Sequence, residues 1–330
     1  MRLAVTFALL FAATPGAAAP SPTLESTLAA IARASGVTVG VFVEHLQRHE
    51  SAGVNATRPF PLASTFKLPL AVAVLRAVER DQLGPLDGKV RLEATDMLGW
   101  ASPLYERMPT GGQATLRELL SSLLENSDNS AADALLRLAG GPARVRASLV
   151  ALGLPDISID RDEAELNLDA SGVPRPPRAQ RTAARVKSLL SGVDPEQQRA
   201  ALGRFAADPR DHATPAAMAR VVERLWRGAI LSAPHSAFVR EAMARCLTGA
   251  HRFRAGLPPG AAVADRTGTC PGLGADGALC ANDVGLLTLP SGEQVVVAAF
   301  VEDGGGPLAP KERLLATLAR AVWDHYTAAR

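Results

Sequence analysis

Residues 64–79 read STFKLPLAVAVLRAVE, a short polar start followed by a long apolar run. Its apolar positions recur at helical spacing and predict a strongly apolar helix over residues 65–79: Phe66, Leu70, Val74 and Val78. Pro69 falls in the first turns, where a missing backbone N–H costs least. Lys67 lies at the edge of this helix, and burial there would lower the pKa of its amine.

The segments on either side of this helix differ in kind. Residues 24–31 have helical spacing, and residues 37–44 form a β-branched run typical of a strand. Downstream we predict four helices over residues 116–124, 131–138, 215–227 and 236–247. Three strands follow over residues 262–265, 284–289 and 295–301, and a last amphipathic helix covers residues 310–326. Because helix and strand pieces at both ends enclose a helical middle, we expect an α+β fold. Its antiparallel sheet is flanked by N- and C-terminal helices, with an inserted all-helical lobe.

Composition excludes several classes of protein. The chain has 330 residues, 47% hydrophobic, and can bury a full core as one or two domains. Its 35 basic and 33 acidic residues nearly balance, which argues against a dedicated nucleic-acid-binding protein. The six His residues show no metal-ligand spacing, so we expect no metal or other cofactor.

The N-terminus has the pattern of a secretory signal peptide. Arg2 precedes an apolar run over residues 3–13, and the small residues 16–19 follow. The run is too short to cross a bilayer, which needs about 20 residues. We therefore expect cleavage near residue 19 and a periplasmic or secreted protein, with no membrane association after cleavage.

Three cysteines allow at most one internal disulfide. Cys270 and Cys280 flank a Gly- and Pro-rich turn, and a bridge across it is favoured over two separate buried thiols. Cys246 lies in an apparently helical segment and is expected to be a buried thiol.

A Pro-rich segment, residues 174–178, precedes two short helical patterns near residues 179–190 and 195–206. Two short helices offer little apolar area. We therefore favour packing of the two helices against each other, as a hairpin on a Pro-rich spacer, over docking of the helices deep against the core.

Ser64 and Lys67, three residues apart at a helix start, face the same side of the helix. A neutral Lys amine can take the proton of a Ser nucleophile, and the helix N-terminus favours a developing oxyanion. The spacing alone is a weak signal, because it also arises by chance.

Three further patterns carry polar groups. Residues 127–129 (SDN) could deliver a proton and hold an amide, or could simply cap a helix. Residues 161–167 (RDEAELN) place a carboxylate near a carboxamide, which suits a water to be deprotonated or an ordinary acidic helix start. Residues 265–270 (DRTGTC) put a cation and a hydroxyl at a strand edge, which suits a substrate carboxylate.

Together, in this order, the four patterns resemble the class A serine β-lactamases over essentially the whole mature chain. The matching residues are Ser64 and Lys67; Ser127, Asp128 and Asn129; Arg161, Glu163, Leu166 and Asn167; and Arg266, Thr267 and Gly268. Trp100 falls where the family has an aromatic wall, and Arg252 matches a second carboxylate-binding Arg found in part of the family.

The chain departs from the family pattern in three places. Arg266 replaces a Lys, as in carbenicillinase-like members. Cys270 resembles a Cys of carbapenem-hydrolysing members, but Ala63 stands where its partner would be, so Cys280 becomes the expected partner. The closing pattern of the omega loop comes only at Asp211, so the loop spans 161–211. It carries the hairpin near 174–206 as an insertion of about 35 residues.

The resemblance implies a two-stage acyl transfer that hydrolyses β-lactams and confers resistance to them. Ser64 would attack the lactam carbonyl, with Lys67, or Glu163 through a water, taking its proton. The N–H groups of Ser64 and Thr269 would form the oxyanion hole, and Ser127 would protonate the leaving nitrogen. Glu163 would then activate a water for deacylation.

The family pattern also implies substrate contacts and domain boundaries. Asn129 would hold a side-chain amide, Asn167 the hydrolytic water, and Thr267, Arg266 and Arg252 the carboxylate. An ion pair between Arg161 and Asp211 would close the omega loop. The implied regions are a signal peptide 1–19, a sheet domain 20–58 with 252–330, and a helical lobe 59–251. A monomer acting on a small β-lactam is expected.

Two alternatives share part of the pattern. A D,D-peptidase or transpeptidase lacks a deacylating Glu on an omega loop, and a penicillin-binding sensor stays acylated. Glu163 with Asn167 therefore favours the hydrolase over both.

Overall fold

The computed structural model describes residues 22–274 and 276–328, so the predicted signal peptide lies outside the described residues. A five-stranded antiparallel sheet has the strand order β2-β1-β9-β8-β7. The strands are β1 (Thr38–His45), β2 (Glu50–Val54), β7 (Ala262–Thr269), β8 (Cys280–Thr288) and β9 (Gln294–Glu302). Strand β1 pairs with β9 along its whole length, so the two ends of the chain build one sheet around the helical middle. The predicted α+β fold is confirmed.

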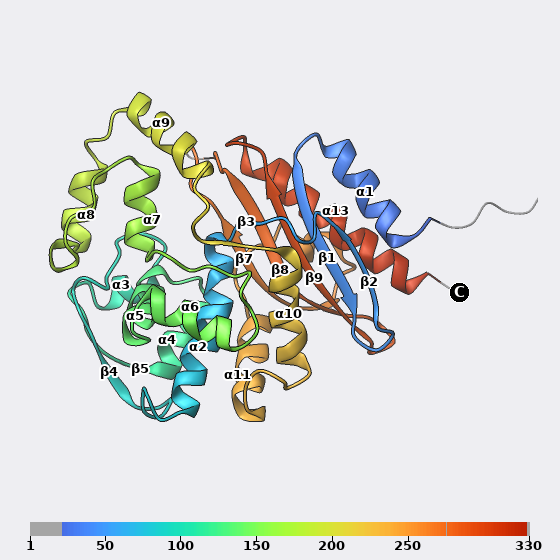
Figure 1. Cartoon of the computed structure of the whole chain (residues 1–330), viewed down its shortest axis with the longest axis horizontal. Coiled ribbons are helices and arrows are strands. Elements are labelled where there is room, and N and C mark those ends of the chain that lie inside the picture. The colour runs from blue at the N-terminus through green and yellow to red at the C-terminus, as the bar shows by residue number, and fades with distance from the viewer. Residues whose placement is uncertain (1–21, 275, 329–330) are drawn as a thin grey trace, which may run out of the picture.

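Helices cover both faces of this sheet (Figure 1). Strand β9 shows the reason, because its successive apolar residues are buried on alternate faces. Val295, Val297, Ala299 and Val301 join the core beneath α1 (Leu24–Ser35), α12 (Phe253–Gly256) and α13 (Leu308–Thr327). Val296, Ala298 and Phe300 join the core shared with α10 (Pro215–Trp226) and the helical lobe.

The lobe is built around α2 (Lys67–Glu79), the apolar helix predicted from residues 65–79. A 3-10 turn, η1 (Ala63–Phe66), leads into it. Its neighbours are α4 (Leu116–Glu125), α5 (Asn129–Leu138) and α6 (Pro142–Ala151). Other elements of the lobe are α3 (Pro103–Arg107), α11 (Ala233–Ala244), the 3-10 turn η2 (Arg178–Gln180), the pair β4 (Lys89–Leu92) and β5 (Gly112–Thr115), and the pair β3 (Phe60–Pro61) and β6 (His212–Ala213).

Several predicted boundaries need correction. Strand β8 begins at Cys280, four residues before the predicted 284, and α8 begins at Ala183 instead of near residue 179. Strand β7 continues four residues past the predicted 262–265, because the polar residues that follow pair in register with β8 as far as Thr269. Helix α11 ends at Ala244, so Cys246 lies beyond it, although its thiol is buried as predicted.

The inserted segment forms helices where they were predicted, but the predicted packing is wrong. Helices α8 (Ala183–Leu190) and α9 (Pro195–Ala206) each pack beside α7 (Glu163–Ala170) and lie apart from each other in Figure 1. Val186 of α8 packs with Leu168, and Leu202 of α9 packs with Ala170. The prediction failed because α7 offers apolar side chains on two sides, which the insertion covers.

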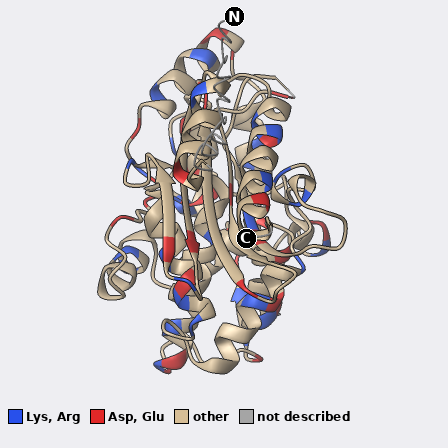
Figure 2. Ribbon diagram, turned by 90° about the vertical axis from the view of Figure 1, so that its right-hand side faces the viewer, with Lys and Arg blue, Asp and Glu red and all other residues tan. Residues whose placement is uncertain are grey.

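The expected disulfide is present between Cys270 and Cys280, with Cα atoms 4.9 Å apart. It joins the end of β7 to the start of β8. Across the described residues, no helix is long and apolar enough to cross a membrane. Basic and acidic residues are interspersed over the elements seen in Figure 2, in keeping with the near-balanced charge.

Candidate active site

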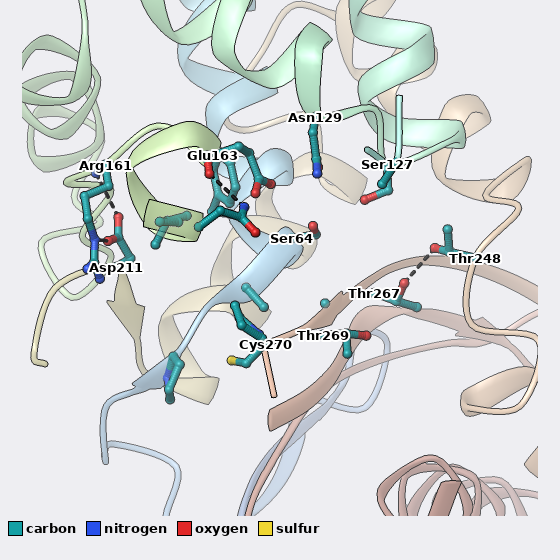
Figure 3. Close-up of a pocket in the computed structure, with 18 of the residues that line it drawn as sticks. Ser64, Ser127, Asn129, Arg161, Glu163, Asp211, Thr248, Thr267, Thr269 and Cys270 are labelled. Carbon is teal, nitrogen blue, oxygen red and sulfur yellow. Dashed lines mark hydrogen bonds and ion pairs between the residues drawn. The ribbon is translucent and has the colours of Figure 1, made fainter. Parts of the chain in front are cut away.

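Ser64 lies in the η1 turn, at the junction between the sheet and the helical lobe (Figure 3). Ala63, just before it, has a positive φ of 44°, which is uncommon for a residue with a side chain. Strand β7 passes close by. A Cβ atom at Gly268 would lie only 2.8 Å from the carbonyl oxygen of Leu62, so glycine permits this approach.

Lys67 is fully buried and contacts Ser64 together with three of the residues around it. Its Nζ lies 3.1 Å from Ser64 Oγ, 3.2 Å from Ser127 Oγ and 2.8 Å from the Ser127 carbonyl oxygen. It also lies 2.5 Å from Asn129 Oδ1 and 3.0 Å from Glu163 Oε1. Burial lowers the pKa of Lys67, and the Glu163 carboxylate opposes this shift. The amine can therefore exchange a proton with either hydroxyl.

Glu163 is the first residue of α7 and points toward Ser64 (Figure 3). Asp162 caps the helix and forms a capping box with Glu165. The buried Asp133 of α5 accepts the N–H of Glu163 at 2.7 Å. Asn167 donates its Nδ2 to the Glu163 carbonyl oxygen at 2.8 Å. The backbone that carries the carboxylate is thus held from three directions.

The SDN segment caps a helix, which is one of the two tasks that its sequence left open, and it also places two side chains beside Lys67. Asp128 caps α5, and its carboxylate also accepts the hydroxyls of Ser102 and Ser122. Ser127, which has a φ of 61°, and Asn129 face Lys67 on either side of this cap. The buried capping carboxylate therefore positions its two neighbours.

Arg266 is buried between the strand and the Ser64 turn. Its Nε donates to the Ser64 carbonyl oxygen at 3.3 Å, and its Nη2 donates to Ser127 Oγ. Nη1 lies 3.7 Å from the Cys246 thiol. The guanidinium thus lies beside the backbone of Ser64 and the hydroxyl of Ser127.

Arg252 is also buried, and protein groups engage each of its three nitrogens. Nη1 donates to the carbonyl oxygens of Gly268 and Asn282, and Nε donates to Glu312. Nη2 donates to Thr269 Oγ1 at 2.5 Å. The Arg252 guanidinium therefore supports β7 and orients the Thr269 hydroxyl.

Sequence reasoning missed Thr248, which carries no motif. Its hydroxyl lies 2.6 Å from that of Thr267 (Figure 3). Because Thr267 and Thr269 both face the cavity, Thr248 adds a third hydroxyl to this side of the site.

The base of the omega loop contains a dense ion cluster. Arg161 is 2% exposed, and its Nε lies 2.6 Å from Asp211 Oδ2. Its Nη1 lies 2.8 Å from Asp169 and 3.1 Å from Asp208. The ring of Phe205 stacks on the guanidinium at 5.0 Å. The ion pair expected with Asp211 is therefore present as one of three.

A cavity of about 430 Å³ joins these groups. The predicted site residues in its lining are Ser64, Trp100, Ser127, Asn129, Arg161, Glu163, Asn167, Asp211, Arg252, Thr267, Thr269 and Cys270. Lys67 and Arg266 lie behind the residues that line the cavity. Cys280 does not line the cavity either, but it is bonded to Cys270, which does. Phe205, Arg210 and His212, which no sequence signal indicated, also line it. In the described part of the chain, no cluster of His, Cys, Asp or Glu is arranged to hold a metal.

Comparisons with known proteins agree on one family. The sequence model described as "Beta-lactamase enzyme family" matches residues 23–326. Beta-lactamase AST-1 of Nocardia asteroides is 30% identical, over 88% of this chain and 79% of that protein. Carbapenem-hydrolyzing beta-lactamase KPC of Klebsiella oxytoca is 29% identical, over 88% of this chain and 84% of that protein. The crystal structure of a beta lactamase from Burkholderia vietnamiensis superposes with a TM-score of 0.73 at 29% identity, covering 94% of this chain and 99% of that one.

Proposed function

This chain belongs to the beta-lactamase enzyme family and is a class A serine β-lactamase, and on that premise we propose how its residues divide the reaction. In the proposed mechanism the enzyme opens the β-lactam amide in two steps. Ser64 is acylated first, and water then releases the acyl group.

Acylation begins with the proton of Ser64 Oγ. We propose that Lys67 takes this proton directly, because its Nζ lies 3.1 Å from Oγ and burial lowers its pKa. The Ser64 oxygen then bonds to the lactam carbonyl carbon. The N–H groups of Ser64 and Thr269 stabilise the oxyanion.

Collapse of the tetrahedral intermediate breaks the lactam C–N bond, and the nitrogen needs a proton. Ser127 supplies it in this proposal, and Lys67, 3.2 Å from Ser127 Oγ, returns the proton taken from Ser64. The nearby Arg266 guanidinium favours the transient negative charge on Ser127 Oγ.

Deacylation is assigned to Glu163 and Asn167. Because Asn167 Nδ2 is engaged by the helix backbone, its carbonyl oxygen remains to hold a water beside the Glu163 carboxylate. Glu163 removes a proton from this water as the water attacks the ester carbon. Glu163 passes this proton to Lys67, 3.0 Å away, and Lys67 delivers it to the departing Ser64 Oγ, which restores the carboxylate and the neutral amine.

Substrate binding falls to the two sides of the cavity. Asn129 and Trp100 contact the acyl side chain, and the hydroxyls of Thr267 and Thr269 contact the carboxylate. Arg266 and Arg252 act on that carboxylate mainly through their positive charge, since their N–H groups are largely engaged by the protein.

One observation carries this assignment. The buried Lys67 amine touches Ser64, Ser127 and Glu163 at once, and so links the acylating, proton-donating and deacylating groups. A D,D-peptidase or a penicillin-binding sensor has no deacylating Glu, so it does not need the contact between Lys67 and Glu163.

The test is Glu163→Gln. We expect it to accumulate a stable acyl-enzyme on Ser64, detected by mass spectrometry after mixing with a penicillin. The matched control is Glu165→Gln, two residues further along the same helix, which should still hydrolyse the penicillin. Full turnover by Glu163→Gln would remove the base role from this residue, and accumulation in Glu165→Gln but not in Glu163→Gln would transfer the role there.

We further propose that the mature enzyme is exported to the periplasm or secreted and acts as a monomer. The disulfide supports export, because such bonds persist in oxidising compartments. Cell fractionation and light scattering of the mature protein test the two parts. A cytoplasmic product or a stable dimer would contradict them.

A further inference from the structure

Four carboxylates crowd the start of α7: Asp133, Asp162, Glu163 and Glu165. Asp133 is 1% exposed, and Asp162 and Glu163 are each 8% exposed. Burial raises the pKa of Asp133 well above its usual range, and the charges of Asp162 and Glu163 add to this shift. Buried carboxylates so close together need positive partners to remain charged and in place.

The structure provides two buried cations for this cluster. One is Lys67, which contacts Glu163 on the side of the nucleophile. The other is Arg181, which comes from the inserted segment and is only 8% exposed. Two further cations are partly exposed: Arg178 lies 3.6 Å from Asp162, and Arg175 lies 3.8 Å from Glu165.

Arg181 contacts both members of the capping box that surrounds Glu163. Its Nη1 lies 3.1 Å and 3.0 Å from the two carboxylate oxygens of Asp162 and 3.1 Å from Glu165 Oε1. Burial and the charge of Glu165 raise the pKa of Asp162, and Arg181 opposes this. The guanidinium thus keeps the capping carboxylate charged and joins the two residues that fix the first turn of α7.

The inserted segment is anchored on both sides of Arg181. Just before Arg181, Arg178 reaches the buried Asp96 of the helical lobe. Just after it, Val186 is fully buried against Leu168 of α7. Arg181 is therefore held from both sides and cannot swing away from the box without breaking these contacts.

We propose that Arg181 is a positioning residue for deacylation: the inserted segment uses it to lock the capping box of α7 and so to fix Glu163 against its water. This inference rests on the proposed role of Glu163 as the base. It assigns the insertion a part in one chemical step, in addition to covering apolar side chains.

The proposal predicts a specific kinetic signature. Ser64 and Lys67 are placed by η1 and α2, and the capping box reaches them only through the contact of Glu163 with Lys67. Loss of Arg181 should therefore slow deacylation and leave acylation intact. When deacylation limits turnover, kcat and KM fall by the same factor and kcat/KM is unchanged. General loss of structure would lower kcat/KM instead.

The variants are Arg181→Met, Arg181→Lys and the control Arg185→Met, an exposed Arg one turn further along on α8. For Arg181→Met we expect kcat and KM for a penicillin to fall together by about 10-fold or more, with acyl-enzyme visible at steady state. Arg181→Lys should recover part of kcat, and the control should match the wild type. Unchanged kcat in Arg181→Met, or a fall in kcat/KM equal to that in kcat, would overturn the proposal.

A double-mutant cycle tests the route of the effect. If Arg181 acts through Asp162, the variant Arg181→Met/Asp162→Asn should lose no more kcat than the worse single variant. Losses that multiply would refute this route. If Arg181→Met does not fold, the Asp162→Asn and Arg181→Lys variants still test the positioning role through the same fall in kcat and KM. If Glu163→Gln accumulates acyl-enzyme while Arg181→Met has wild-type kcat, the positioning role alone fails.

Discussion

The ion cluster at the base of the omega loop allows a quantitative prediction for two substitutions, Asp211→Asn and Arg161→Met. Asp211 accepts the backbone N–H groups of Asp160 at 2.7 Å and of Arg161 at 3.1 Å through Oδ1, and binds Arg161 Nε through Oδ2. An Asn side chain at 211 can keep the two backbone bonds through its oxygen and loses only the charged one. It also tolerates the φ of 57° at this position.

The two substitutions should differ in cost because their remaining partners differ. Burial raises the pKa of Asp211, so its ionisation contributes no net stability at neutral pH. In Asp211→Asn, Arg161 still has Asp169 at 2.8 Å and Asp208 at 3.1 Å. The cost is then that of one charge-assisted hydrogen bond, about 2 kcal/mol. Arg161→Met instead leaves the Asp211 carboxylate buried without its cation, at a cost of about 3–5 kcal/mol.

Thermal unfolding followed by circular dichroism measures this difference. At about 2 °C per kcal/mol for a chain of this size, we expect Tm to fall by about 4 °C for Asp211→Asn and by about 6–10 °C for Arg161→Met. Since the loop carries Glu163, the ratio of kcat/KM for a penicillin to that for a bulky cephalosporin should also shift in Asp211→Asn. Equal Tm losses for the two variants, or a larger loss for Asp211→Asn, would refute the reasoning. An unchanged substrate ratio would refute the link to the loop.

The other predictions concern the insertion, the disulfide and pH. Replacing residues 174–206 by a short Gly linker should destabilise the enzyme, because apolar side chains of α7 become exposed; a Tm within about 2 °C of the wild type would show that the insertion is autonomous. Replacing both Cys270 and Cys280 by Ala should cost about 2–3 kcal/mol, measured by urea unfolding, and an unchanged midpoint would contradict this. Burial of Glu79 acts to raise its pKa, but hydrogen bonds, chiefly from the Ser232 N–H, outweigh it and lower the pKa to about 2. Wild-type stability should therefore fall as the pH drops from 4.5 toward 2, and Glu79→Gln should abolish that part of the fall; identical profiles would exclude the role.

Local patterns predicted much of the fold because they record burial directly. The spacing of Phe66, Leu70 and Val74 predicted α2, and the β-branched residues predicted β1 and β9. Strand β7 was predicted too short because Arg266 and Thr267 are polar, and polarity normally marks a strand end. Both are buried here because hydroxyl and carbonyl partners on other elements satisfy them.

The site residues likewise differ in whether a local pattern or a long-range contact reveals them. The residues in recurring motifs, such as Ser64 with Lys67, could be predicted as site residues because their contact depends on a spacing of a few residues. Thr248, Phe205 and Arg181 could not, since each acts through a contact with a segment distant in the sequence.

The amino-acid sequence by itself determined the fold class, the order of helices and strands and the set of groups able to perform acyl transfer, because these depend on periodicity and on chemistry within a few residues. Only the tertiary structure decided where the insertion packs and which cations balance the buried carboxylates of α7. Two short amphipathic helices bury their apolar faces wherever matching surface is available, and here that surface belongs to α7 rather than to each other. Likewise, a charge is stable in the interior only beside a partner, and it is the folding of distant segments together that brings Arg181 to Asp162.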